Sequence, residues 1–224
     1  MLHLCFDLDG VIADSTIPIT ACINRALADL DLPGRPPADL LQYIGPPLIR
    51  SFESIVSEVG ASPAFAIRCV ERYRHHYAVE SLLSTRLYSG LGEVLERAGS
   101  SADLVVVTSK PAEAAVPILE ALGVRSHFSA VHAPHHDSLA EPRAVTLARA
   151  MAETGAEPAN TVMIGDRHLD IDAGRGCSVR TVGVLWGFGT RAELEAAAAD
   201  HLVADPPALM ALIEALAAVP DWPI

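Results

Sequence analysis

The chain lacks the features that mark several large classes of protein. Lys110 is its single lysine, and no run of basic residues offsets a formal net charge of −12 over 224 residues. A surface of that sign repels the phosphate backbone of nucleic acid. No apolar segment approaches the roughly 20 residues of a membrane-spanning helix. We therefore expect neither a nucleic-acid partner nor a membrane partner.

Cysteine is scarce and widely spaced. The four cysteines, at positions 5, 22, 69 and 177, include no C-x-x-C pair, which excludes a zinc ribbon and a thioredoxin motif. We expect reduced thiols in a reducing compartment. The apolar stretch at 2–6 is too short for a signal peptide and lacks a basic segment before it. These features predict a cytoplasmic protein.

The glycine-rich phosphate loops of nucleotide-binding proteins are absent as well. Neither G-x-x-x-x-G-K-[ST] nor G-x-G-x-x-G occurs in the chain. At long range this acidic protein repels an anionic substrate. Any phosphate site therefore needs a metal ion or a local basic cluster to reverse the sign of the potential.

Half of the residues are hydrophobic, and their spacing alternates between two periods. Short apolar runs predict buried strands at 2–6, 104–107, 161–164 and 181–184, with a weaker one at 130–132. Apolar positions three and four residues apart predict helices at 91–98, 115–122, 145–151 and 209–216. Unbroken apolar strands are typical of sheets covered on both faces. The alternation predicts an α/β fold with a doubly wound, Rossmann-like parallel sheet.

Residues 16–84 break this alternation because they contain no strand pattern. Helical faces are predicted there at 19–30, 48–59 and 63–83. We therefore predict two units, an α/β core formed by 1–15 and 85–224, and an inserted all-helical cap domain formed by 16–84. A helical module that directly follows an active-site loop is suited to act as a lid.

Acidic and hydroxyl side chains follow three of the predicted strands. Asp7 and Asp9 come after the first, Thr108 after the second, and Asp166 and Asp170 after the third. Ligands of open α/β sheets bind beyond the carboxyl ends of the strands, so these side chains converge if the strands are neighbours. Four carboxylates cannot crowd together without a cation. Mg²⁺, a hard ion that prefers oxygen ligands, is the expected one.

The motifs around these residues resemble the signatures of one superfamily. FDLDGVIADS (6–15), VVVTSKP (105–111) and MIGDRHLDIDAG (163–174) are similar to the first, second and fourth signatures of the haloacid dehalogenase (HAD) superfamily. YIGPPLIRSF (43–52) and VLWGFGT (184–190) resemble its phosphoglycolate phosphatase-like branch. The resemblance implies a HAD-like core with a helical cap.

The resemblance also implies roles for individual residues. Asp7 is the nucleophile that becomes an aspartyl phosphate, and Asp9 is the general acid and base. The implied metal ligands are Asp7, Asp9, Asp166 and Asp170. The implied phosphate-binding residues are Thr108, Ser109, Gly10 and Lys110.

The third signature is where the chain departs from the family pattern. The family places a lysine beside the nucleophile, and Arg143 stands at the position where we align that lysine, within DSLAEPRAVTLARAM (137–151). Arginine keeps the positive charge but is larger and forks its donors. We predict that Arg143 is a catalytic residue. Lys110 is the alternative cation.

Several polar residues have a plain structural interpretation. Asp172 is interpreted as a solvated acid in the first turn of a helix. His132, His135 and His136 are interpreted as part of a polar loop at the edge of the crevice, and a metal cluster is the alternative. Arg50 either reaches from the cap to a substrate carboxylate or sugar, or lies on the surface.

The function implied by the resemblance is a Mg²⁺-dependent phosphatase acting on a small phosphorylated metabolite. Phosphoglycolate and a nucleoside 5′-monophosphate are the candidate substrates. The alternatives are a phosphomutase of the same fold and a regulatory phosphate-binding protein with a degraded site, the latter motivated by Arg143. The oligomeric state is left open, and a homodimer is one alternative.

Overall fold

The computed structural model of the chain describes residues 1–134 and 141–218. Its main sheet has six parallel strands in the order β5-β4-β1-β6-β7-β8. Their bounds are β1 Leu2–Phe6, β4 Ala102–Val107, β5 Ala130–His132, β6 Thr161–Gly165, β7 Arg180–Val184 and β8 His201–Val203. The predicted α/β fold with a parallel, Rossmann-like sheet is confirmed, and β8 is a strand that the sequence pattern did not reveal.

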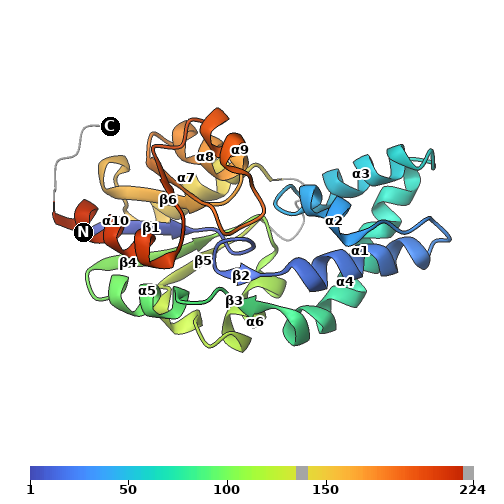
Figure 1. The fold of residues 1–224 in the computed structure, drawn as a ribbon, viewed down its shortest axis with the longest axis horizontal. Coiled ribbons are helices and arrows are strands. Elements are labelled where there is room, and N and C mark those ends of the chain that lie inside the picture. The colour runs from blue at the N-terminus through green and yellow to red at the C-terminus, as the bar shows by residue number, and fades with distance from the viewer. Residues whose placement is uncertain (135–140, 219–224) are drawn as a thin grey trace.

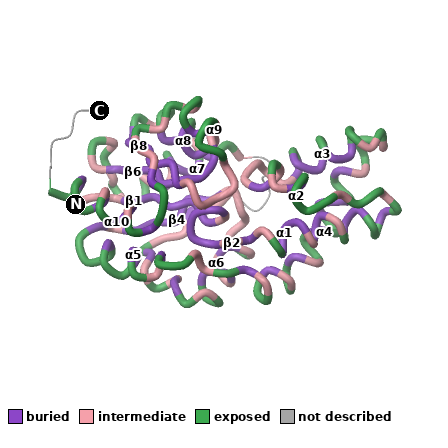
Figure 2. Tube along the Cα trace, in the orientation of Figure 1, coloured by how far each residue is buried: buried purple, intermediate pink, exposed green. Residues whose placement is uncertain are grey.

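Helices cover both faces of this sheet because successive side chains of each strand point to opposite faces. Leu4 and Phe6 of β1 pack with the helices of one face, whereas Cys5 packs with those of the other. The first group is α5 Leu91–Ala98, α6 Ala112–Ala121 and α10 Pro206–Ala218, and the second is α7 Arg143–Thr154 and α8 His168–Gly176. The strands are buried between these layers, as Figure 2 shows.

The register of the central strands brings their carboxyl ends to one edge of the sheet. Phe6, the last residue of β1, pairs with Val106 of β4 and with Ile164 of β6. The strands that precede Asp7, Thr108 and Asp166 are therefore immediate neighbours. This arrangement meets the condition on which the predicted convergence of these residues depended.

The segment between β1 and α5 is helical. It contains α1 Thr16–Ala28, α2 Pro37–Leu40, α3 Leu48–Glu58 and α4 Ala64–Ser84. Figure 1 shows these helices grouped beyond the end of the sheet that lies opposite the chain termini. The chain leaves and re-enters the α/β part through β2, Ala13–Asp14, which pairs antiparallel with β3, Arg86–Leu87. This two-stranded ribbon was not predicted, because strands of two residues show no periodicity.

The remaining described elements are short. They are α9 Arg191–Ala196 and three single-turn 3₁₀ helices, at Leu41–Tyr43, Arg125–His127 and Pro158–Asn160. None of the described helices has both the length and the apolar character needed to cross a membrane.

Candidate active site

Asp7 occupies the first position beyond β1 and is almost fully buried. Its backbone N–H donates to the carbonyl of Ile164 at 2.9 Å, which extends the pairing of β1 and β6 to the carboxylate itself. The chain then turns at Gly10, whose φ is +88°. A Cβ at Gly10 would lie 2.1 Å from Asp166 Oδ2. The glycine therefore serves both the left-handed turn and the close approach of Asp166.

Three buried carboxylates gather at this edge of the sheet. Asp7, Asp166 and Asp170 each offer an oxygen, and these oxygens lie within 4.8 Å of one another. Burial raises the pKa of Asp7 to about 7, although Arg143 opposes that rise. Burial likewise raises the pKa of Asp166 well above its usual value, with Asp170 adding to the effect. Without a nearby cation this arrangement favours protonated carboxyl groups.

The acidic cluster has the chemistry of a site for a hard divalent cation. All of its donor atoms are carboxylate oxygens, which such ions prefer. Asp7 Oδ1 and Asp166 Oδ1 are buried and have no hydrogen-bond partner among the described residues. Buried oxygens of this kind are rarely left unsatisfied in native proteins. A cation bound between Asp7 and Asp166 would satisfy both.

Both carboxylate oxygens of Asp170 have partners within the protein. Its Oδ2 accepts from the backbone N–H groups of Asp166 and Arg167 at 3.1 and 3.0 Å. Its Oδ1 forms an ion pair with Arg143. Because both oxygens already have partners, the geometry favours a role in fixing the loop that carries Asp166 over direct binding of a cation.

Arg143 is the first residue of α7 and its side chain is only 4% exposed. Its Nη1 lies 2.7 Å from Asp7 Oδ2, and Nη2 donates to Ser109 Oγ at 3.0 Å. Together with the Asp170 ion pair, these contacts place one guanidinium between two carboxylates and a hydroxyl. Burial alone would lower the pKa of Arg143, but Asp170 and Asp7 raise it.

Thr108 and Ser109 extend from β4 into the same crevice. Thr108 is buried, and its N–H donates to the carbonyl of His132 at 3.0 Å, which fixes the loop after the strand. Thr108 Oγ1 accepts from the Lys110 N–H at 3.2 Å. Both hydroxyl residues line the cavity together with Asp7 and Asp9, as their predicted role in phosphate binding requires.

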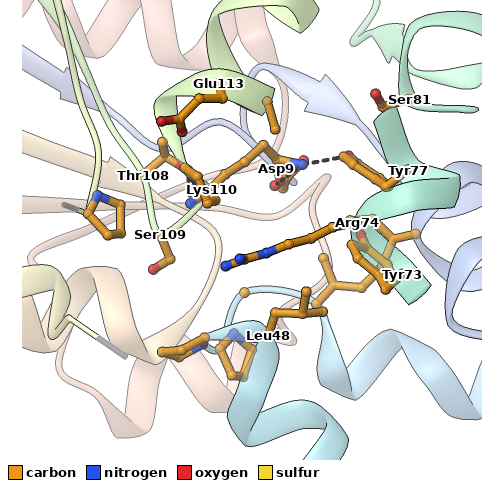
Figure 3. Close-up of a pocket in the computed structure, with 18 of the residues that line it drawn as sticks. Asp9, Leu48, Tyr73, Arg74, Tyr77, Ser81, Thr108, Ser109, Lys110 and Glu113 are labelled. Atoms are coloured by element: carbon orange, nitrogen blue, oxygen red, sulfur yellow. Dashed lines mark hydrogen bonds and ion pairs between the residues drawn. The ribbon is translucent and has the colours of Figure 1, made fainter. Parts of the chain in front are cut away.

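Lys110 contacts Asp9 rather than the carboxylate of Asp7. Its Nζ lies 3.0 Å from Asp9 Oδ2 and donates to the hydroxyl of Tyr77 at 2.5 Å (Figure 3). Ser15 Oγ donates to the other oxygen, Asp9 Oδ1, at 2.6 Å. Asp9 is thus held at both oxygens. Sequence reasoning assigned no role to Ser15, although it ends the FDLDGVIADS motif, and none to Tyr77, which lies in no motif.

A loop after β7 closes around Asp166. The N–H of Phe188 donates to Asp166 Oδ2 at 2.6 Å. A Cβ at Gly187 would lie 2.4 Å from Asp166 Cβ, so the loop approaches too closely for any other residue. Trp186 donates from Nε1 to the Val11 carbonyl at 3.1 Å. In the sequence this stretch stands out only by its resemblance to the family, whereas in the structure it contacts the acidic cluster.

Arg167 joins the α/β part to the helical segment, a contact that the sequence did not predict. Its Nε lies 2.9 Å from Glu193 Oε1, and its Nη1 donates to the carbonyl of Ile44. Burial would raise the pKa of Glu193, yet the His168 N–H and the Arg167 side chain lower it to about 2. The arginine is therefore aligned by a charged partner while it binds the backbone between α2 and α3.

Asp172, Arg50 and His132, which were given a plain interpretation or left open, are not part of the acidic cluster. Asp172 is exposed on α8, and Arg50 is exposed and pairs with Glu53 at 2.8 Å. His132 is buried, and its Nδ1 lies 3.6 Å from Glu153. His135 and His136, with residues 137–140 of the third signature, lie outside the described residues.

The α/β part and the helices together enclose a cavity of about 370 Å³. Asp7, Asp9, Thr108 and Lys110 line one end of it, the candidate catalytic end. Residues of α4 and of the turn before α3 form the rest of its wall, and Figure 3 shows Tyr73, Arg74 and Tyr77 extending from α4 toward it. The site therefore combines a buried acidic cluster with a chamber large enough for a small organic group.

Comparison with known proteins identifies the family. The model of haloacid dehalogenase-like hydrolases matches residues 4–184. The chain belongs to this family, which confirms the predicted superfamily. A 5′-nucleotidase of Pseudomonas aeruginosa is 32% identical over 213 residues, covering 95% of each chain. A phosphoglycolate phosphatase of Aquifex aeolicus is 26% identical, covering 96% of this chain and 97% of its own.

A solved structure has the same architecture. The crystal structure of a predicted phosphatase from Clostridium acetobutylicum superposes with a TM-score of 0.89 and 26% identity, covering 96% of this chain and 98% of the other. The likeness confirms the HAD-like α/β fold expected from the motifs.

The acidic cluster generates a prediction about cation binding. Mg²⁺ should raise the melting temperature of the wild-type protein, because an ion at 100 times its Kd adds about 2.7 kcal/mol of stability. Asp166→Asn should lose this shift, since it removes one of the unsatisfied oxygens. Asp172→Asn, an exposed acid on the adjacent helix, is the matched control and should keep it. Thermal unfolding and isothermal titration calorimetry provide the measurements, and an equal Mg²⁺ response in both variants would contradict the assignment.

Proposed function

We propose that the protein is a Mg²⁺-dependent phosphatase that hydrolyses a small phosphomonoester through an aspartyl-phosphate intermediate on Asp7. The observation that carries the proposal is the state of the Asp7 carboxylate. Its Oδ2 is held by Arg143 at 2.7 Å, its Oδ1 has no partner among the described residues, and the group lines the cavity. The enzyme class, a phosphoric monoester hydrolase, is supported by the family and by the relatives named above.

The residues of the site divide the reaction into two steps. Asp7 attacks phosphorus, and Asp9 gives its proton to the leaving oxygen, which departs as an alcohol. Water then attacks the phosphorus of the aspartyl phosphate, Asp9 accepts its proton, and inorganic phosphate leaves with Asp7 restored. Thr108 and Ser109 orient the phosphoryl oxygens. Asp7 and Asp166, with the Asp9 main-chain carbonyl, would hold Mg²⁺, which would supply the positive charge that the phosphoryl group needs.

Arg143 takes the place of the lysine in the third signature. The reaction brings a phosphate dianion toward Asp7, and one Mg²⁺ does not cancel all of the negative charge. A guanidinium bridges a carboxylate and a phosphate oxygen through separate N–H groups. Its present contacts with Asp7 and Ser109 suit that role. A degraded regulatory site has less support than an enzyme, because the substituted cation still reaches the nucleophile.

The helical segment is proposed to be the cap. In this proposal residues 1–15 and 85–224 form the core, and 16–84 close over the crevice and exclude water from the leaving group. The contacts of Tyr77 with Lys110 and of Arg167 with the Ile44 carbonyl join the two parts around the cavity. Phosphoglycolate and nucleoside 5′-monophosphates, the substrate types named by the relatives, are the proposed substrate classes.

The nucleophile can be tested directly. Asp7→Asn should abolish the release of phosphate from p-nitrophenyl phosphate, because an amide cannot form the acyl phosphate. The fold should persist, since Arg143 keeps its ion pair with Asp170. EDTA should likewise remove wild-type activity and Mg²⁺ should restore it. More than a trace of turnover in folded Asp7→Asn, or full activity in metal-free enzyme, would overturn the mechanism.

The substituted cation gives a separate prediction. Arg143→Ala should lower kcat about 100- to 1000-fold, the loss of roughly 3–4 kcal/mol of transition-state stabilisation. It also leaves Asp7 and Asp170 buried without their partner, which costs about 3–5 kcal/mol of folding stability. Arg143→Lys, which keeps the charge, should retain much of the activity and most of the stability. Steady-state kinetics and chemical denaturation measure the two effects.

The activity of a Lys110→Ala variant, compared with that of Arg143→Ala, can contradict this assignment. If folded Arg143→Ala behaves like the wild type while Lys110→Ala is inactive, then Lys110 is the cation of the third signature. If the wild type has no measurable phosphatase activity and neither substitution changes this, the regulatory interpretation is favoured instead.

A further inference from the structure

The cavity contains one cationic side chain that the chemistry at Asp7 does not use. Three of its lining residues carry a positive charge, namely Arg74, Lys110 and Arg143. Lys110 is paired with Asp9 and Arg143 with Asp7. Arg74 has no hydrogen bond or ion pair within the described part of the chain. Figure 3 shows its guanidinium extending from α4 across the cavity toward Ser109.

Aromatic packing anchors the turn of α4 from which Arg74 extends. The preceding residue, Tyr73, is buried and stacks on Tyr77 with ring centroids 5.0 Å apart, and its ring edge meets Phe52 at 6.0 Å. Tyr77 in turn contacts Lys110 beside Asp9. The packing of these rings therefore positions this turn of α4 beside the candidate catalytic end, and the exposed Arg74 side chain extends from it.

The surroundings of Arg74 favour a charged partner. Leu48, Pro47 and Leu82 also line the cavity, and apolar walls strengthen an interaction between opposite charges once a ligand has displaced the water. A guanidinium binds a carboxylate or a phosphate with two parallel N–H donors. A cavity with apolar walls and one arginine that has no partner among the described residues is suited to an organic ligand with one anionic group.

We infer that Arg74 is a specificity residue that binds a second anionic group, on the leaving-group side of the substrate. The preferred substrates are then phosphomonoesters whose alcohol portion carries a carboxylate or a further phosphate. This inference rests on the proposed phosphatase function and adds a subsite to it. A cavity of about 370 Å³ has room for an alcohol portion larger than the two-carbon acid of phosphoglycolate.

Two pairs of esters test the inference, because the members of each pair differ mainly in the anion. They are 2-phosphoglycolate with ethyl phosphate, and 3-phosphoglycerate with glycerol 3-phosphate. The wild type should prefer the charged member of at least one pair. Arg74→Met should lower kcat/KM for that charged member about 10- to 100-fold, the range expected for a lost charge-assisted hydrogen bond. For the neutral members kcat/KM should change less than about threefold.

A matched control separates the subsite from the general charge of the cap. Arg50→Met removes an arginine from α3 that is exposed, pairs with Glu53 and does not line the cavity. It should leave all four kcat/KM values within about twofold of the wild type. Arg74→Lys, which keeps the charge without the fork, should recover part of the lost selectivity. Unchanged melting temperatures exclude a folding defect.

The other outcomes are equally clear. Equal losses for the charged and neutral members would place Arg74 on the transferring phosphoryl group and overturn the inference. So would an Arg74→Met variant that keeps wild-type selectivity, or a wild type that hydrolyses p-nitrophenyl phosphate but prefers neither charged ester. Release of no phosphate from any ester would instead count against the proposed function.

Discussion

Repulsion among buried carboxylates is the constraint on which the site depends. Asp7, Asp166 and Asp170 are packed against one another at the edge of β1 and β6, where burial disfavours their charged forms. Arg143 offsets part of this repulsion from α7, and backbone N–H groups stabilise Asp170 and Asp166. Asp7 Oδ1 and Asp166 Oδ1, which have no partner among the described residues, are the atoms to which a cation would bind. The same charges that would destabilise an empty site would favour binding of a metal ion and, through it, of phosphate.

The contacts between the two parts of the chain converge on the same site. Tyr77 on α4 reaches Lys110, and Lys110 holds Asp9, the proposed general acid. Arg167, next to Asp166, binds the carbonyl of Ile44 in the helical segment. A displacement of the helices would therefore disturb the neighbours of both Asp166, a proposed metal ligand, and Asp9, the proposed proton donor. If the helical segment closes over the crevice as proposed, this geometry would link that closure to assembly of the proposed catalytic groups.

Much of this could be predicted from the sequence, because the informative residues stand next to strong patterns. The apolar runs before Asp7, Thr108 and Asp166 indicated buried strands of a parallel sheet. That these strands are neighbours, the condition for their ends to converge, came from the structure. The pairing of Arg143 with Asp7 was expected only through a family resemblance. Tyr77 and Arg74 could not be found, because they belong to one long helix in which no local pattern distinguishes a residue facing a cavity from one facing water. Tertiary packing alone decides that orientation.

The central claim is that Asp7 carries the phosphoryl group during turnover. The most direct measurement is to quench the wild-type protein during hydrolysis with Mg²⁺ present, reduce it with borohydride and map its peptides by mass spectrometry. An acyl phosphate on Asp7 is reduced to homoserine, so the account predicts homoserine at position 7, dependent on both substrate and Mg²⁺. Homoserine at another carboxylate, or an unmodified position 7 while phosphate is being released, would contradict it.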